Sequence, residues 1–477
     1  MEFETIIGLE IHSELSTKSK IYCSCTTQFK GQPNTHCCPI CMGMPGTLPL
    51  LNKKVVEYAI KAGHAMNCSI AQYSKQDRKN YFYPDLPKAY QVTQHDIPIC
   101  SNGYIDIEVN GDTKRVGIKR IHIEEDTGKL LHDQSDTSTL ADFNRCGVPL
   151  IEIVTEPDVR SPQEGKAVLE AIKSILQYIE VSDCKMEEGS LRCDVNLSVR
   201  TADKSKWTKQ SEMKNLNSFS GALRAMEFEE KRHRKLIEQN NMPATKESRR
   251  WDDAKGESYF MRVKETEHDY RYFPEPDVPP IILDSAYIES IKQTLPELPE
   301  TKKKRYIEQY GLPSYDASLL TSSKKLADFF EDAVSKSNNS KAVSNWIMGD
   351  MTRIMKERNM EVEDIPFPAQ HLAQLIKLID AGTISGTIAK TVFEEMFDKA
   401  QAPEVIIKEK GLVQVNDENE ILQMVKTVLD QNKQSVEDYK NGKDKAFGFL
   451  VGQTMKMSKG KANPVMINKI LKQELGK

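Results

Sequence analysis

The sequence lacks long apolar runs, a signal-peptide pattern in its first residues and a strong charge of either sign. No apolar run is long enough to span a bilayer. Residues 1–5 are acidic and do not have the charged start or the apolar stretch of a signal peptide. The net charge of −4 does not indicate nucleic-acid binding, although a local basic patch is compatible with it. We therefore predict a cytoplasmic protein without membrane contact.

Two common nucleotide-binding motifs are also absent. The chain has no G-x-x-x-x-G-K-[ST] segment, and no G-x-G-x-x-G follows a strand-like run. No Ser-His-Asp or Cys-His pair stands out in the sequence, although such groups are spatial and are not excluded by this. Any nucleotide site in this chain therefore belongs to another class.

The first 280 residues are rich in strand-like runs. A chain of 477 residues is too long for one ordinary core, so several domains are expected. The clearest runs are 104–109, 116–123, 150–154 and 195–199, with helical patterns at 161–179 and 219–239 between them. The runs are β-branched or alternate apolar with polar residues. This part is predicted to be one large α+β domain built on an antiparallel or mixed sheet.

The pattern becomes helical after the proline-rich segment 274–280. Apolar residues then recur at helical spacing to about Ala402, and a small helical tail follows. In 440–477, nine lysines face only Asp444 and Glu474, a local excess of seven positive charges. Such a helix is usually a solvated face, but the lysines gather at the turn 456–464. That turn would suit contact with a phosphate backbone.

Four of the ten cysteines form two short pairs near the N-terminus. They are Cys23, Cys25, Cys38 and Cys41, in a C-x-C and a C-x2-C arrangement. Thiolates suit zinc, and two short pairs bring four sulfurs together without a large core. Because four sulfurs leave no open position, we predict a structural zinc that rigidifies a loop. Cys37 and His36 are spare candidates, and reduced cysteines that are neighbours by chance are the alternative.

Acidic residues recur on successive strand-like runs. Glu10, His12 and Glu14 alternate, so on a strand they project from one face. Further carboxylates belong to Glu124, Glu125, Asp126, Glu152, Glu156 and Asp194. Such groups are costly in apolar strands unless they are paired or bind a metal. Several of them in one pocket would suit magnesium, which keeps waters for phosphates. The alternative is that each one caps a turn or pairs with a nearby Arg or Lys.

Cationic and amide residues form short clusters as well. They lie at 78–81, 144–145, 192–196, 214–219, 249–252 and 269–276. Arg and Lys could clamp a triphosphate and stabilise charge during phosphoryl transfer, and salt-bridged surface charge is the alternative. These residues by themselves predict a magnesium-dependent phosphoryl-transfer enzyme.

Seven segments resemble the B subunits of the aspartyl/glutamyl-tRNA(Asn/Gln) amidotransferases. They are 7–12, 38–43, 78–88, 121–129, 189–196, 214–219 and 269–276. The resemblance runs essentially from end to end, and 456–472 fits the C-terminal domain of that family. It implies a cradle-shaped catalytic domain with a zinc loop at 1–292, a helical domain at 293–406 and a tRNA-contacting tail at 407–477.

The resemblance implies a two-step reaction on misacylated tRNA. ATP first phosphorylates the side-chain carboxylate of Glu-tRNA(Gln) or Asp-tRNA(Asn). Ammonia then displaces phosphate to give Gln-tRNA(Gln) or Asn-tRNA(Asn). The chain would thus be a ligase that forms C–N bonds with glutamine as amido donor. Phosphorylation gives the carboxylate a leaving group, so the protein has mainly to position the substrates and neutralise charge.

The same resemblance implies partners and cofactors. A glutaminase A subunit would release ammonia into a tunnel, and a small C subunit would complete a heterotrimer. ATP, Mg²⁺ and structural Zn²⁺ would be bound. The alternative is a non-catalytic, zinc-dependent tRNA-binding scaffold. Such a scaffold has little reason to collect carboxylates in a groove for an anionic ligand.

The resemblance also implies roles for single residues. The implied magnesium ligands are Glu10, His12, Glu125, Glu152 and Asp194. Arg192, Asn196 and Ser190 would face the nucleotide. Glu10, His12, Glu125 and Lys79 are the catalytic candidates, with Glu125 also placed where ammonia emerges and Lys79 lining the tunnel or the active site. The four paired cysteines carry over as zinc ligands. Ala89 stands where glycine is usual, which leaves the geometry of its turn open.

Overall fold

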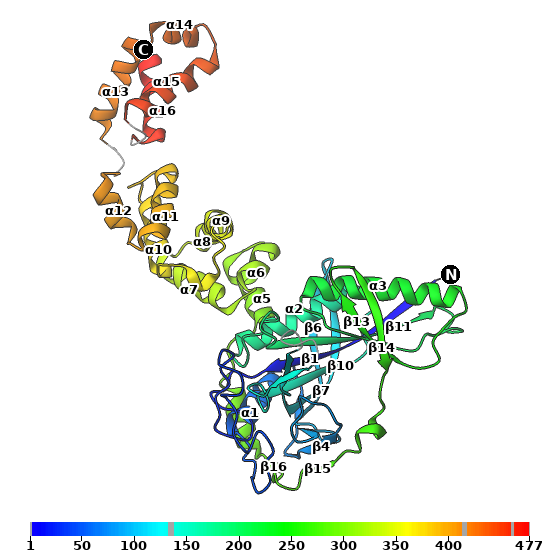
Figure 1. The fold of residues 1–477 in the computed structure, drawn as a ribbon. Coiled ribbons are helices and arrows are strands. Elements are labelled where there is room, and N and C mark those ends of the chain that lie inside the picture. The colour runs from blue at the N-terminus through cyan, green and yellow to red at the C-terminus, as the bar shows by residue number, and fades with distance from the viewer. Residues whose placement is uncertain (1, 132–137, 413–416, 459–461, 477) are drawn as a thin grey trace. The chain divides into compact units, whose positions relative to one another are not determined.

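The computed structural model describes residues 2–131, 138–412, 417–458 and 462–476. The chain divides into two compact units, Met1–Leu298 and Pro299–Lys477 (Figure 1). The first unit combines strands with helices and the second is helical, so the predicted fold class is confirmed. The boundaries expected at 292/293 and 406/407 remain predictions.

A nine-stranded mixed sheet forms the first unit. Its strands, in spatial order, are β14 (Glu257–Val263), β13 (Glu247–Asp252), β12 (Ser211–Lys214), β11 (Leu191–Thr201), β1 (Phe3–Glu14), β10 (Pro149–Thr155), β7 (Asp112–Glu125), β6 (Cys100–Val109) and β2 (Ser69–Ile70). Among these described strands, only β12 and β13 pair in parallel. The four strand-like runs predicted from the sequence lie within β6, β7, β10 and β11.

Three long helices accompany this sheet, namely α1 (Lys53–Ala65), α2 (Pro162–Tyr178) and α3 (Phe219–Glu238). Their buried residues share one core with the sheet. Ser161 and Ser218 accept hydrogen bonds from the backbone N–H groups of Glu164 and Gly221, which fixes where α2 and α3 begin. Both helical segments predicted from the sequence are confirmed.

Strand β1 lies at the centre of the sheet and has one apolar face and one polar face. Its odd-numbered residues, including Ile7, Leu9 and Ile11, are buried in the core. Its even-numbered residues project from the opposite face, because successive side chains in a strand alternate. The register pairs Glu10 with Asp194 and His12 with both Glu152 and Arg192. Polar residues of neighbouring strands therefore meet on this second face.

Short elements complete the first unit. They are β3 (Tyr73–Ser74), β4 (Asp77–Asn80), β5 (Tyr90–Thr93), β8 (Lys129–Leu131), β9 (Leu140–Asp142), η1 (Glu267–Tyr270), β15 (Phe273–Pro274), β16 (Ile281–Ile282) and α4 (Ser285–Lys292). Strands β15, β4 and β5 form a small sheet of their own.

The second unit consists of helices. They are α5 (Pro299–Tyr310), α6 (Ser314–Leu320), α7 (Lys324–Ser337), α8 (Ser340–Trp346), η2 (Ile347–Met351), α9 (Thr352–Glu357), η3 (Val362–Asp364), α10 (Ala369–Asp380), α11 (Gly386–Lys399), α12 (Pro403–Lys410), α13 (Glu418–Gln431), α14 (Lys433–Lys440), α15 (Asp444–Met457) and α16 (Pro464–Leu475). Helices α13, α15 and α16 bury a common core that includes Val425, Leu450 and Ile467. Lys459 and Lys461 of the predicted basic turn lie outside the described residues. Among the described residues, none of the helices combines the length and apolarity that a bilayer crossing requires.

Candidate functional site

The polar face of the large sheet lines a cavity of about 820 Å³, which we call the main cavity. Strands β1, β7, β10, β11 and β12 contribute to its wall, together with the segment 262–272. Five residues predicted from the sequence line it, namely Glu10, His12, Lys79, Glu152 and Asp194. The period-two alternation of the strands thus brings four of the eight acidic residues noted in the sequence into one space, namely Glu10, Glu124, Glu152 and Asp194.

The first acidic group in this cavity, the His12 cluster, consists of His12, Glu124 and Glu152. One ligand atom from each lies within 4.8 Å of the others. His12 Nε2 is 3.4 Å from Glu152 Oε2 and 3.6 Å from Glu124 Oε1. Behind them, buried His122 places its Nε2 3.2 Å from Glu152 Oε2.

The carboxylates of the His12 cluster control the protonation of its histidines. Burial lowers the pKa of His12, but the charges of Glu152 and Glu124 outweigh burial and raise it to about 9. The pKa of His122 is raised in the same way. Burial alone would raise the pKa of Glu152, yet the two imidazolium groups hold it well below its usual range. Without a metal, the cluster is therefore a set of buried ion pairs.

The second acidic group, the Glu10 cluster, consists of Glu10, Asp194 and Glu212. Their carboxylate oxygens also lie within 4.8 Å of one another. Lys214 Nζ is 2.5 Å from Asp194 and 3.3 Å from Glu212, and Lys264 Nζ is 3.1 Å from Glu212. Burial raises the pKa of Glu212, but these two lysines outweigh it and lower the pKa to about 2. Three carboxylates from three strands thus share two cations.

Both clusters fit a hard divalent cation. Carboxylate oxygens are the donors that magnesium prefers, and a neutral imidazole can complete a mixed set. His122 Nδ1 is buried without a hydrogen-bond partner among the described residues. His122 contacts Glu152 as His12 does, so this polar atom without a partner belongs to the same network.

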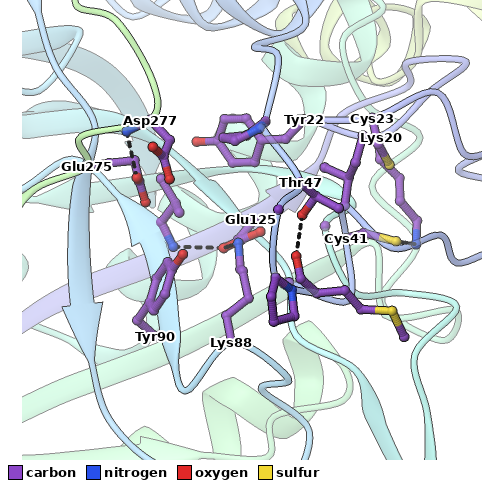
Figure 2. A pocket seen from close by; sticks show the side chains of 18 residues that line it. Lys20, Tyr22, Cys23, Cys41, Thr47, Lys88, Tyr90, Glu125, Glu275 and Asp277 are labelled. Atoms are coloured by element: carbon purple, nitrogen blue, oxygen red, sulfur yellow. Dashed lines mark hydrogen bonds and ion pairs between the residues drawn. The ribbon is translucent and has the colours of Figure 1, made fainter.

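Glu125 lies outside both clusters. It follows Glu124 on β7, and consecutive side chains of a strand point to opposite faces. Its carboxylate pairs with Lys88 Nζ and accepts a hydrogen bond of 2.8 Å from the backbone N–H of Val92. It lines a separate cavity of about 210 Å³, the Glu125 cavity, beside Tyr90 and Cys41 (Figure 2).

The residues predicted to contact the nucleotide have different surroundings. Arg192 Nη2 lies 2.7 Å from Asp126 Oδ2. Burial by itself would lower the pKa of the guanidinium, but the charge of Asp126 outweighs burial and raises it. Ser190 accepts a hydrogen bond of 2.8 Å from the backbone N–H of Lys185. Asn196 donates to Glu10 Oε1 at 2.8 Å and accepts from Lys264, so it borders the Glu10 cluster.

Lys79 lies in the main cavity with its ammonium 4.8 Å from the centre of the Tyr270 ring.

Two residues of the acidic clusters were not assigned to a metal site from the sequence. Glu124 lies two positions after His122, so the alternation of side chains along a strand would have placed both on the same face. Glu212 had no such signal, because β12 has only four residues.

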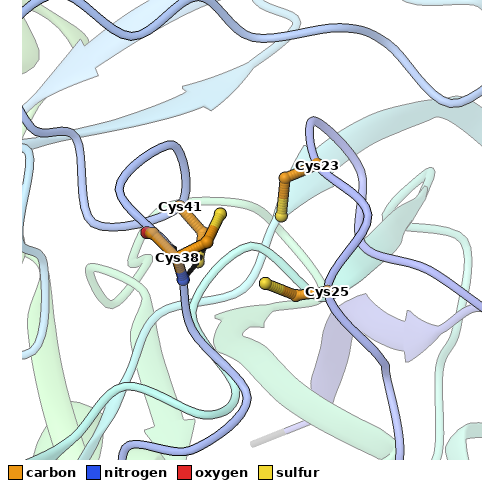
Figure 3. Close-up of side chains that lie close together, drawn as sticks. All are labelled: Cys23, Cys25, Cys38 and Cys41. Carbon is orange, nitrogen blue, oxygen red and sulfur yellow. Dashed lines mark hydrogen bonds between the residues drawn. The ribbon is translucent and has the colours of Figure 1, made fainter.

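The four predicted zinc-site cysteines come together. Their sulfurs lie within 4.8 Å of one another and point inward (Figure 3). The backbone N–H of Cys38 donates to Cys41 Sγ at 3.1 Å, and the pKa of Cys41 is lowered to about 5, first by its hydrogen bond with Cys23. This tetrathiol group is compatible with a bound metal. Cys37 instead donates to the carbonyl of Asn34 at 3.2 Å and lies outside the group.

Ala89 adopts a left-handed backbone with φ of 63° in the turn before β5. Its N–H donates to the carbonyl of Leu86 at 3.0 Å. The conformation is the one that glycine adopts most readily, so alanine forms this turn at some cost in backbone strain.

Comparison with known proteins places the chain in one family. Residues 5–289 match the family model described as the GatB/GatE catalytic domain, and residues 328–475 match the GatB domain. The chain is 63% identical to the B subunit of aspartyl/glutamyl-tRNA(Asn/Gln) amidotransferase from Caldicellulosiruptor bescii. It is 59% identical to the protein of that name from Thermoanaerobacter pseudethanolicus and 56% identical to the one from Clostridium tetani. Each match covers all of both chains. The chain belongs to the family of aspartyl/glutamyl-tRNA(Asn/Gln) amidotransferase B subunits, as its motifs predicted.

Proposed function

We propose that this chain is the cytoplasmic subunit that converts Glu-tRNA(Gln), Asp-tRNA(Asn) or both into the amidated forms at the expense of ATP. The observation that carries the proposal is the pair of acidic clusters on one wall of the main cavity. Two groups of carboxylates in a space lined by lysines suit a reaction that joins an acidic side chain to phosphate. A purely tRNA-binding scaffold would gain nothing from carboxylates there.

The two clusters would each hold one magnesium ion. The proposed ligands are His12, Glu124 and Glu152 at one site and Glu10, Asp194 and Glu212 at the other. Bound magnesium would neutralise phosphate oxygens during transfer. Lys214 and Lys264 form ion pairs with the Glu10 cluster. Magnesium bound there would replace them, and both lysines could then contact the nucleotide.

The protein residues would contribute mainly position and charge. The lysine and arginine side chains that line the main cavity would hold the phosphates. Lys79, which packs against the Tyr270 ring, would face the developing negative charge. The side-chain carboxylate of the misacylated tRNA would then attack the terminal phosphorus of ATP. This gives an acyl phosphate and ADP, and ammonia displaces phosphate from the acyl carbon.

We assign the Glu125 cavity to the delivery of ammonia. It lies beside the tetrathiol group and contains the Lys88–Glu125 pair, which can exchange a proton with a small basic molecule. A glutaminase A subunit would supply the ammonia, and a small C subunit would complete the heterotrimer. Zinc on the four cysteines would brace the wall of this cavity.

Two neighbouring substitutions test this division of roles. Glu124→Gln should abolish acyl-phosphate formation, because it removes a carboxylate from the His12 cluster. Glu125→Gln should leave acyl-phosphate formation intact but lower amidation at least about 100-fold, through loss of proton transfer to or from ammonia. The heterotrimer is assayed with misacylated tRNA, ATP and ammonia in place of glutamine, and acyl phosphate is trapped with hydroxylamine. The exposed Glu187→Gln is the control. Wild-type amidation by Glu125→Gln would contradict the assignment.

Metal affinity should depend on pH through His12. Its raised pKa of about 9 means that magnesium must displace a proton, so binding at the His12 cluster should tighten by about tenfold per pH unit from 7 to 9. Above that pH the affinity should level off. Calorimetric titration with Mg²⁺ at several pH values measures this, and His12→Gln should remove the dependence. A pH-independent affinity in the wild-type protein would argue against His12 as a ligand.

Removal of zinc should destabilise the N-terminal part of the first unit. A structural metal supplies folding free energy to a loop with little apolar core. Chelation, or the double change Cys38→Ser and Cys41→Ser, should lower the melting temperature and raise amide exchange in residues 20–47. Cys37→Ser is the matched control, because its sulfur lies outside the group. An unchanged melting curve after verified metal loss would contradict the structural role.

Deletion of residues 413–477 should weaken tRNA binding. The cut leaves α12 complete and removes the lysine-rich helices α15 and α16. Affinity should fall, and the slope of log K against log salt should shrink by about one for each lost phosphate contact. Filter binding at several salt concentrations measures both quantities. An unchanged slope would show that the tail makes no phosphate contact.

A further inference from the structure

A polar network lies between α3 and the large sheet and has no part in the function proposed so far. His233 and Glu229, one turn apart on α3, are both fully buried. His233 Nε2 lies 3.3 Å from Glu229 Oε2, and Arg232 Nη2 lies 2.8 Å from the same oxygen. We call these three residues the His233 network. Burying such groups is costly unless their hydrogen bonds are satisfied, so their contacts deserve an account.

Both ring nitrogens of His233 contact one short segment of the chain. Nδ1 lies 2.7 Å from Thr208 Oγ1, and Nε2 lies 2.8 Å from Ser211 Oγ. Burial lowers the pKa of His233 by more than Glu229 raises it, so the ring is neutral and offers one donor and one acceptor. A hydroxyl group can match either nitrogen. The imidazole thus bridges positions 208 and 211.

The bridged segment has little support from the backbone ladder of the sheet. Trp207 forms an isolated bridge with Arg200 and β12 begins at Ser211, so residues 208–210 belong to no strand. Strand β12 itself has only four residues. Few ladder hydrogen bonds therefore fix the position of this segment, and side-chain contacts carry more of the task.

The same segment also faces the main cavity. Lys209 and Gln210 line that cavity, and so does Glu212, which belongs to the Glu10 cluster. Ser211 lies between them, is buried and contacts α3. Because successive side chains of a strand alternate, the contact of Ser211 with His233 turns Glu212 toward the cavity.

Helix α3 provides a fixed anchor for this bridge. Arg232 Nη2 donates to Ser211 Oγ at 2.9 Å. Glu229 accepts a hydrogen bond from Ser258 of β14 and lies 3.3 Å from Arg249 Nε of β13. The His233 network thus connects one helix to β12, β13 and β14. Directional contacts of this kind specify a position along the strand, which apolar packing alone specifies less sharply.

We propose that His233 is a positioning residue that orders the Glu10 cluster from the opposite side of the sheet. Its ring holds the segment 208–212 in place, so that Glu212 reaches the other two carboxylates while Lys209 and Gln210 face the main cavity. His233 is fully buried and acts through the strand. The inference rests on the proposed function, because it takes the Glu10 cluster as a metal site.

The test measures two quantities in the heterotrimer, the amide hydrogen exchange of residues 208–212 and the affinity for Mg²⁺ by calorimetric titration. The titrated proteins also carry Glu124→Gln, which disables the His12 cluster. His233→Phe keeps a ring of similar size but loses both polar contacts. Exchange in 208–212 should rise at least about tenfold relative to β11, and the Mg²⁺ affinity should fall about tenfold.

A conservative variant and a control separate position from stability. His233→Gln can place its amide near the position of Nε2, beside Ser211, and should restore most of both quantities. Ile237→Val is the matched control, because Ile237 lies one turn further along α3 and is fully buried in the core. It should lower the melting temperature without a selective rise of exchange in 208–212 and without a change in Mg²⁺ affinity.

Unchanged exchange of 208–212 in His233→Phe overturns the proposal. An equal loss of Mg²⁺ affinity in His233→Phe and Ile237→Val also overturns it, because general destabilisation would then explain the effect. If His233→Phe does not fold, Ser211→Ala removes the contact from the other side and is judged by the same outcomes. Failure of the Glu124→Gln protein to bind Mg²⁺ would instead contradict the Glu10 cluster as a metal site. The exchange data would still decide whether His233 holds the segment.

Discussion

The alternation of side chains along β1 is the constraint on which the rest of the structure depends. Odd positions such as Ile7, Leu9 and Ile11 anchor the strand in the core, and even positions carry Glu10 and His12 to the opposite face. A shift of one residue would move these charges into the apolar layer, where unpaired ions cost several kcal/mol. The hydrophobic core therefore specifies the register of the polar site, and neighbouring strands contribute their polar residues in matching rows.

Charge compensation is the second consequence of this arrangement. Each carboxylate of the two clusters lies within 4 Å of a histidine or a lysine nitrogen. We propose that each cluster exchanges these internal cations for an external one when a divalent ion binds. Such an exchange would free lysines and protons on the side where phosphate is expected. The same carboxylates therefore contribute both to the stability of the protein and to the affinity of the clusters for a divalent ion.

Much of this could be predicted from the sequence, and the failures have physical causes. The alternation of Glu10 and His12, the paired cysteines and the two helical patterns at 161–179 and 219–239 are local signals, and all are present as expected. Glu124 and Glu125 are adjacent acids at the end of a strand, where only the strand's register tells which one faces the cavity. The contact of Arg192 with a nucleotide stays a prediction, and its ion pair with Asp126, 66 positions away, is one that no local pattern reveals. The place of Glu212 beside Glu10 and Asp194 likewise depends on contacts between distant segments.

We propose that the polar face of the sheet holds two metal ions at its two acidic clusters. Crystals of the heterotrimer soaked with Mn²⁺ and a non-hydrolysable ATP analogue would test it through anomalous scattering. One peak is expected among His12, Glu124 and Glu152 and a second among Glu10, Asp194 and Glu212, with none at Glu125. Peaks at other positions, or a cavity with nucleotide and no metal at either cluster, would contradict it.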